Sequence, residues 1–95
     1  MKFYVYIIFS RGLNSFCVGQ TINVENRLEA HNSGKSQYTS GGIPWILLWF
    51  TTKSNLSEAQ KLEQKIKNLS QERKIRFMQK YELYIQVTDL MNVIT

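Results

Sequence analysis

The sequence is poor in several residues on which whole classes of protein depend. It has one cysteine, one proline and one histidine among its 95 residues. A single cysteine, Cys17, excludes an internal disulfide framework and a Cys-rich zinc site, and it favours a reducing compartment, so we expect a cytoplasmic protein. The longest apolar run is much shorter than a membrane span, and no signal-peptide pattern opens the chain, so neither membrane anchoring nor export is expected.

The length and charge of the chain narrow the possibilities further. Its 95 residues, of which 43% are hydrophobic, predict one folded domain with a core of its own. Lys and Arg number 12 against 7 Asp and Glu, which gives a net charge of +5. This surplus favours a polyanionic partner such as nucleic acid, although proteins that bind no polyanion also carry it.

The N-terminal part of the chain predicts an antiparallel hairpin. Residues 3–9 are all β-branched or aromatic, which is typical of a central, largely buried strand. Residues 10–15 are rich in turn-forming types, and residues 16–19 resume an apolar run. Because side chains alternate across a strand, one face of the first strand carries Tyr4, Tyr6 and Ile8.

A short helix is predicted directly after the hairpin, over residues 24–31. Thr21 and Asn23 are its N-cap candidates, and Arg27 and His31 lie one turn apart on the same side. Gly34 then suits the left-handed residue that follows a helix, and residues 35–44 form a loop. Beyond the loop, residues 45–52 are apolar on both faces, which predicts a third strand in the middle of the layered fold.

A second helix is predicted to open at residues 54–57, where Ser57 and Gln60 match the capping-box pattern. Glu63 lies beside its apolar stripe, so the carboxylate is expected to point toward the sheet. A buried carboxylate must be paired, protonated or bound to a metal, because an isolated charge is too costly there. The stripe consists of Ala59, Leu62, Ile66 and Leu69, and the solvated side carries Lys61, Lys65 and Lys67.

A third helix is predicted from residue 71 to about residue 83, with Ser70 as its N-cap and a basic exposed side. Its inward residues are expected to be Ile75, Met78 and Tyr81. Residues 84–95 fit either a strand or a helical turn. We therefore expect a domain over residues 1–83 and a C-terminal extension over residues 84–95.

Candidate chemistry rests on a sparse set of residues. The sequence has no glycine-rich phosphate loop, no serine or cysteine triad, and no His or carboxylate cluster at metal-ligand spacing. Phosphodiester hydrolysis needs little more than a guanidinium for the phosphate, a carboxylate for a divalent cation, and a phenol or imidazole beside the attacking water. Tyr6, Arg27, His31 and Glu63 supply these groups if both helices pack on the same region of the sheet.

The order of these residues resembles the GIY-YIG nuclease superfamily. The two tripeptides of that family fall on Tyr4-Val5-Tyr6 and Cys17-Val18-Gly19, its arginine on Arg27 and its glutamate on Glu63. The segment from His31 to Lys35, together with Tyr38-Thr39 and Pro44-Trp45, is similar to a small stand-alone bacterial branch. In that branch, one domain similar to the nuclease domain of the excision-repair excinuclease ABC makes up the whole protein.

The resemblance implies an α+β fold, the GIY-YIG α/β sandwich, with a small, mostly antiparallel three-stranded sheet flanked by about three helices. It implies an endonuclease that hydrolyses DNA with a single divalent metal, Mg²⁺ or Mn²⁺, in DNA repair or processing, without an obligate protein partner. By the same resemblance, Tyr6 and His31 act on the attacking water, Arg27 engages the phosphate and Glu63 holds the metal. Lys35 and Tyr38 are the expected further contacts to nucleic acid, and Gly19 leaves no room for a side chain.

This sequence departs from the family pattern at three positions. Cys17 replaces the tyrosine of the second tripeptide, and a thiol has neither the reach nor the hydrogen bonding of a phenol. Gln20 stands where some relatives have lysine, and Tyr4 replaces a glycine, as is common in the small branch.

Two other functions therefore stay open from the sequence. Cys17 favours a nucleic-acid-binding module of the same fold with weak or no cleavage, and the segment from Tyr84 would serve a protein-binding domain. Taken singly, the candidate residues also have structural explanations: Tyr6 as a core tyrosine, Arg27 and His31 as cover for a helix surface, and Glu63 as a solvated partner of lysines.

Overall fold

A computed structural model of the chain describes residues 1–35 and 38–81. The predicted α+β fold is confirmed, with three strands and three helices in this part of the chain. In order, the elements are β1 (Phe3–Ser10), β2 (Ser15–Thr21), α1 (Val24–Asn32), the 3-10 turn η1 (Ser40–Gly42), β3 (Trp45–Lys53), α2 (Leu56–Lys67) and α3 (Gln71–Lys80). The predicted C-terminal extension, residues 84–95, lies outside the described residues.

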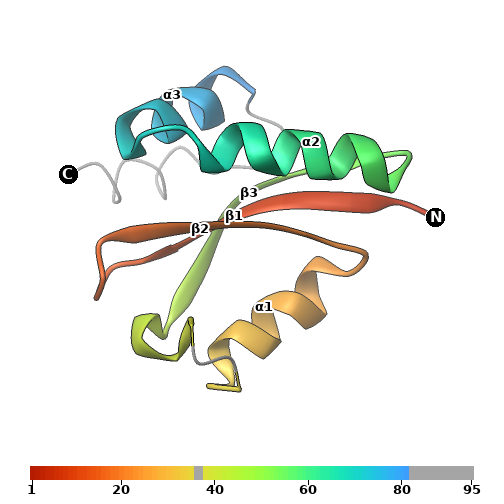
Figure 1. Cartoon of the computed structure of the whole chain (residues 1–95). Helices are drawn as coiled ribbons and strands as arrows, with labels where there is room; N and C mark the ends of the chain where they lie inside the picture. Colours follow the sequence, from red (N-terminus) through yellow and green to blue (C-terminus); the bar gives the residue numbers. More distant parts are fainter. Residues whose placement is uncertain (36–37, 82–95) are drawn as a thin grey trace.

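The sheet is antiparallel, and β1 is its central strand, as its composition predicts. The strand order is β2-β1-β3, so β2 and β3 are the two edges. The sheet forms the middle layer of the molecule, with α1 on one face and α2 and α3 on the other (Figure 1). Residues 45–52 were therefore correctly predicted to lie in the middle layer, at an edge of the sheet within it.

The alternation of side chains along β1 divides the core in two. Val5, Ile7 and Phe9 are buried on the side of α2 and α3, where they join a cluster that includes Ile66 and Met78. Tyr6 and Ile8 are buried on the other side, in a cluster with Trp45 and with Leu28 of α1. This alternation places the Tyr6 side chain on the face covered by α1.

Local hydrogen bonds explain where the helices begin. Asn23 is the N-cap of α1, as predicted, and its side chain accepts a hydrogen bond from the backbone N–H of Asn26. Ser70 likewise caps α3. The capping box predicted for α2 is wrong, because Asn55 rather than Ser57 is the N-cap: its Oδ1 atom lies 2.8 Å from the backbone N of Glu58.

The other end of each helix also bears on the predictions. Gly34 adopts the expected left-handed conformation after α1, with φ of +80°. Helix α3 ends at Lys80, and Tyr81 is 44% exposed rather than turned inward, because its ring packs on the outer side of Phe77 with ring centroids 4.8 Å apart. No helix within residues 1–35 and 38–81 has the length and apolar character needed to cross a membrane.

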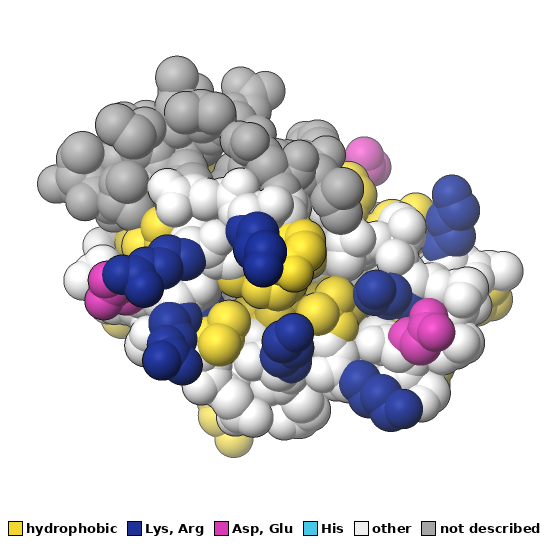
Figure 2. Space-filling model, turned by 90° about the horizontal axis from the view of Figure 1, so that it is seen from above, with side chains coloured by type: hydrophobic (Ala, Val, Ile, Leu, Met, Phe, Trp, Pro, Cys, Tyr) yellow, Lys and Arg dark blue, Asp and Glu magenta, His cyan; other side chains and the backbone are white. Residues whose placement is uncertain are grey.

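The outer surface of α2 and α3 is rich in basic side chains. Figure 2 looks onto this face and shows Lys and Arg side chains spread around smaller apolar patches. One of them, Arg76, is paired with Glu72 at 2.7 Å between Nη2 and Oε1, in an exposed contact that contributes little to stability.

Candidate functional site

A pocket of about 260 Å³ opens at the β2 edge of the sheet. Four candidate residues line it: Tyr6 from β1, Arg27 and His31 from α1, and Glu63 from α2. Helices α1 and α2 lie on opposite faces of the sheet, yet α2 packs against β2, which has no strand beyond it. Side chains from both faces therefore reach the same pocket around this edge.

Tyr6 is the residue to which the α1 side of the pocket is joined. Its side chain is buried, and its hydroxyl oxygen lies 3.0 Å from Nε2 of His31. The Nε–H of Arg27 donates to the same oxygen at 3.4 Å. Burial raises the pKa of Tyr6 above its ordinary value, and the neighbouring Arg27 opposes this only in part, so the phenol is neutral near pH 7.

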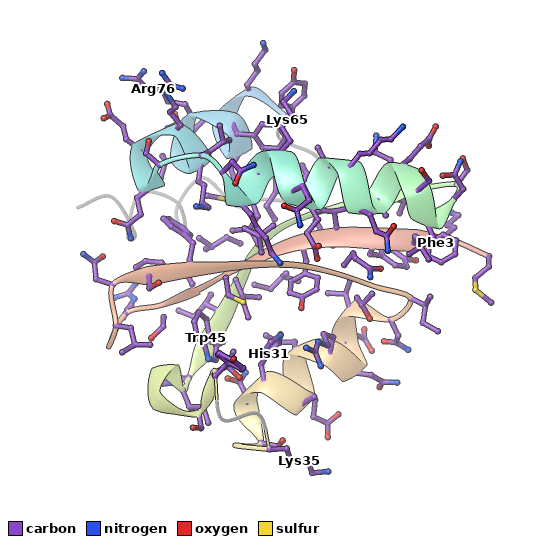
Figure 3. The ribbon with its side chains drawn as sticks, in the orientation of Figure 1. Phe3, His31, Lys35, Trp45, Lys65 and Arg76 are labelled. Carbon is purple, nitrogen blue, oxygen red and sulfur yellow. The ribbon has the colours of Figure 1, made fainter. Side chains whose placement is uncertain are left out.

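His31 is buried between the sheet and the loop that follows α1. Figure 3 shows it pointing from α1 toward the sheet, beside Trp45. Its Nδ1 atom lies 3.2 Å from Oγ1 of Thr39. Burial, and then the charge of Arg27, lower the pKa of His31 below its ordinary value near 6.5, so the imidazole is neutral at pH 7.

These contacts favour one tautomer of His31. The Arg27 guanidinium can only donate, so the Tyr6 hydroxyl accepts from it and has its own proton to give. With the ring proton on Nδ1, His31 donates to Thr39 and accepts from Tyr6 at Nε2. The result is a chain of directed hydrogen bonds from Arg27 through Tyr6 to His31.

Thr39 is a residue of the site that sequence reasoning missed. It was placed in a loop, but it is 5% exposed, and its carbonyl accepts a hydrogen bond of 2.7 Å from Nε1 of Trp45. This bond holds the loop over α1 and brings the Thr39 hydroxyl to His31. The available signal was the need of a buried imidazole for a partner at each nitrogen.

Gly19 fits against the Tyr6 ring. The two residues are directly paired across β2 and β1. A Cβ atom at position 19 would lie 2.6 Å from Cζ of Tyr6, well inside contact distance. The expectation that this position has no room for a side chain therefore agrees with the geometry, and the absent side chain leaves space for the phenol.

Substituting Gly19 with alanine is expected to lower the free energy of unfolding by about 1–3 kcal/mol, because the buried, hydrogen-bonded Tyr6 ring cannot move aside without loss. Urea unfolding measures the change. Gly41→Ala is the matched control, since a Cβ atom there meets nothing within 4 Å. Equal stability of the two variants would contradict the account of Gly19.

Glu63 lies with Lys67 at the α2 side of the pocket. The Glu63 side chain is 16% exposed, consistent with the expected orientation toward the sheet. The prediction that Lys67 lies on the solvated side is wrong, because its Nζ atom is 3.7 Å from Oε1 of Glu63 and it lines the pocket. The spacing of four residues was the signal that places both on one side of a helix.

Cys17 lies within the electric field of every charged residue in the described lining. Burial raises the pKa of its thiol, Lys67 and Arg27 lower it, and Glu63 raises it. The balance is a raised pKa, so the thiol is protonated at pH 7 and is not a reactive thiolate. Gln20, the other departure from the family pattern, also lines the pocket.

The remaining candidates are distributed unevenly. Tyr38 is 98% exposed and lines the pocket, whereas Lys35 is exposed at the end of α1 that is farthest from the sheet (Figure 3). Tyr4 lies outside the pocket lining and packs against Phe50 with ring centroids 5.9 Å apart. Val18 is buried at the pocket wall.

The donor set of the pocket fits a hydrated magnesium-type cation. Within residues 1–35 and 38–81, no group of three or more His, Cys, Asp or Glu side chains is placed to hold a metal. Glu63 supplies the one carboxylate among the described lining residues. Mg²⁺ is commonly held by one or two carboxylates while water fills its other positions, whereas a structural zinc or calcium site needs more protein ligands.

Comparison with known proteins gives consistent results. The sequence model described as the GIY-YIG catalytic domain matches residues 2–86. A UPF0213 protein of Staphylococcus haemolyticus is 38% identical over 79 residues, which cover 82% of this chain and 95% of the relative. A UPF0213 protein of Oceanobacillus iheyensis is 38% identical over 77 residues, which cover 80% of this chain and 88% of the relative.

A solved structure shows the same similarity in three dimensions. The solution NMR structure of a UPF0213 protein from Bacillus halodurans aligns with a TM-score of 0.55 and 30% sequence identity. The alignment covers 96% of this chain and 94% of the other.

Proposed function

Because this chain belongs to the GIY-YIG catalytic-domain family, a nuclease-type family, we propose that it is a divalent-metal-dependent endonuclease that hydrolyses DNA phosphodiester bonds. The observation that carries the proposal is the pocket at the β2 edge, where a guanidinium, a hydrogen-bonded phenol and imidazole, and a carboxylate meet. The relatives carry only a family number in their names, so the metal, the DNA substrate, the part in DNA repair or processing and the cytoplasmic location are our proposals.

Arg27 binds the phosphate in this proposal. Its side chain lies at the mouth of the pocket, anchored by the hydrogen bond from Nε to Tyr6. A guanidinium held in this way can direct two parallel N–H donors at one phosphate and stabilise the charge that builds up in the transition state. Lys35 and Tyr38 make further contacts with the nucleic acid, Tyr38 by stacking on a base from its exposed position.

Tyr6 and His31 act together on the attacking water. A neutral phenol can take a proton from water only if it passes on its own proton. Its hydroxyl is 3.0 Å from Nε2 of His31, which is neutral and able to receive that proton. Thr39 keeps the imidazole in the required tautomer and acts as a positioning residue.

Glu63 holds the divalent cation. A cation bound there, Mg²⁺ or Mn²⁺, would polarise the phosphate and stabilise the leaving oxygen. The carboxylate is held on a helix, and its low exposure fixes its direction into the pocket. Glu63 therefore places the positive charge on the side of the phosphate opposite the Tyr6 and His31 pair.

The acid limb of the pH–rate profile is expected to lie below pH 6.5. Protonation turns Nε2 of His31 from an acceptor into a donor, so Tyr6 can no longer pass on its proton. Burial and the facing charge of Arg27 lower the pKa of His31, which moves this loss to a lower pH than for a free histidine. Below the pKa, the rate should fall about tenfold for each pH unit.

Single-turnover cleavage rates between pH 5 and 8 test this expectation, with His31→Gln as the comparison. The variant should be slower and should lack the limb. A limb above pH 6.5, or one that persists in His31→Gln, would remove His31 from the proton path.

A second candidate function is supported by Cys17. The thiol is protonated and shorter than the phenol that the family pattern has at this position. If that phenol is essential, the chain retains the Arg27 and Tyr38 contacts and binds nucleic acid without efficient cleavage. The retained Glu63 argues against this function, because a binding role needs no carboxylate beside the phosphate.

One assay separates the two functions. The purified protein is incubated with Mg²⁺ or Mn²⁺ and labelled single-stranded, duplex or branched DNA, with and without EDTA. Arg27→Ala, purified in the same way, reports contaminating nuclease. Metal-dependent cleavage that the variant lacks supports the endonuclease, whereas salt-sensitive binding without cleavage supports the binding module.

A further inference from the structure

Lys67 is the charged residue of the pocket to which the steps above assign no part. It lies one helical turn beyond Glu63 on α2 and lines the same pocket as Arg27 and Tyr6. Among the described lining residues, Arg27 and Lys67 are the two permanent cations. Lys67 thus adds a positive charge on the side of the pocket where the carboxylate lies.

The contact between Lys67 and Glu63 is loose on one side and fixed on the other. The distance of 3.7 Å from Nζ to Oε1 is too long for a good hydrogen bond. The Lys67 side chain is 47% exposed, while that of Glu63 is 16% exposed. A pair of this kind contributes little to stability, so the ammonium group can leave the carboxylate at small cost while the carboxylate stays in place.

The position of Lys67 also allows its charge to act across the pocket. Its ammonium group lowers the pKa of Cys17 on β2 more strongly than the Arg27 guanidinium does. The Lys67 side chain therefore lies over the edge of the sheet, on the path between Glu63 and the position where a phosphate would meet Arg27. Its four-carbon stem gives the ammonium group freedom to move along this path.

An ammonium group and a divalent cation compete for the same carboxylate. Both are drawn to the Glu63 oxygens, and they repel each other at the distances that the pocket allows. The cation can bind fully only when the ammonium group has moved away. A phosphate held by Arg27 is the nearest anion that would attract the ammonium group from Glu63.

We propose that Lys67 is the counter-ion of Glu63 in the free protein and moves to the scissile phosphate when DNA binds. This inference rests on the proposed function. It makes binding of DNA and binding of the divalent cation mutually favourable, because each removes the partner that blocks the other, and such coupling must be reciprocal. Lys67 then also contributes a second positive charge to the phosphate beside Arg27.

Binding of Mn²⁺ in the absence of DNA tests the first half of the proposal. Electron paramagnetic resonance measures free Mn²⁺ in titrations of the wild type, Lys67→Gln and Glu63→Gln. Lys67→Gln should bind Mn²⁺ about tenfold more tightly, as expected for removing one cation beside the site. Glu63→Gln should lose the binding.

Lys65→Gln is the matched control. It removes the same charge from the same helix, but Lys65 is exposed and lies beside β3 and α3, on the side of α2 away from the pocket (Figure 3). Its Mn²⁺ affinity should equal that of the wild type. An equal gain in Lys65→Gln and Lys67→Gln would reveal a general effect of net charge and overturn the proposal.

The second half is tested with a short duplex containing phosphorothioate linkages that resist cleavage. The duplex should tighten Mn²⁺ binding to the wild type, and the gain should shrink several-fold in Lys67→Gln. If Mn²⁺ binding depends on Glu63 but not on Lys67, the inference fails and the proposed metal site stands. If the wild type and Lys67→Gln both fail to bind Mn²⁺, the metal-dependent function and the inference fail together.

Discussion

Substitution of Arg27 by alanine is expected to lower the rate of DNA cleavage by several powers of ten. The guanidinium faces the charge that develops on the phosphate, and loss of one such donor typically costs about 10²–10³ in rate. Arg27 carries more than one donor, and its Nε also holds the Tyr6 hydroxyl at 3.4 Å, so the substitution disturbs two functions at once. Single-turnover cleavage at saturating protein measures the loss of rate separately from the loss of DNA affinity.

The comparison variants separate charge from geometry. Arg27→Lys keeps the charge but not the planar pair of donors, so it should recover DNA affinity more than rate. Arg11→Ala removes an exposed guanidinium from the turn between β1 and β2, outside the lining of the pocket, and should cleave at nearly the wild-type rate. Arg27 would be excluded from the site if its alanine variant cleaved as fast as Arg11→Ala.

Stability should change little in Arg27→Ala. The Arg27 side chain is exposed, and substitutions at such positions are usually within about 0.5 kcal/mol of neutral. A thermal unfolding curve therefore shows whether the variant is still folded under the conditions of the cleavage assay.

The parts of the site that depend on local pattern could be predicted from the sequence. Alternation along β1 places Tyr6 on one face, and the spacing of four residues places Arg27 above His31 on α1. Glu63 could be placed beside the apolar stripe of α2 because that stripe follows the helical period. These relations are set within one element, where the backbone fixes which side chains share a face.

The parts that depend on packing between elements could not be predicted in the same way. No local pattern shows that β2 is an edge strand, yet this is what allows Glu63 to meet Arg27 from the opposite face of the sheet. Thr39 reaches His31 only because the loop is held by Trp45, which is on a different element. The family resemblance supplied the convergence that periodicity alone could not.

The two local errors have local causes. At the start of α2, both Asn55 and Ser57 are residues that cap helices well, and the sequence did not distinguish them. Lys67 was grouped with the solvated lysines because its neighbours are basic, although its spacing from Glu63 indicated a pair. In both cases, the hydrogen bond or ion pair that forms is decided by a shift of the helix by one or two residues.

Substitution of Glu63 by glutamine is expected to abolish metal-dependent cleavage without unfolding the protein. An amide has nearly the shape of a carboxylate but lacks the charge that holds a hard divalent cation. The exposed Lys67 can turn to solvent when its partner is removed, so no buried charge is left unpaired. Glu58→Gln is the matched control, because it makes the same chemical change at an exposed position of the same helix.

The most direct test of the nuclease site is the single-turnover rate of Mn²⁺-dependent DNA cleavage by the wild type, Glu63→Gln and Glu58→Gln, each shown to be folded by its thermal unfolding curve. We predict cleavage by the wild type and by Glu58→Gln, and a rate for Glu63→Gln that does not differ from the rate in EDTA. Equal cleavage by Glu63→Gln and the wild type would contradict the assignment of this pocket as the metal-dependent site.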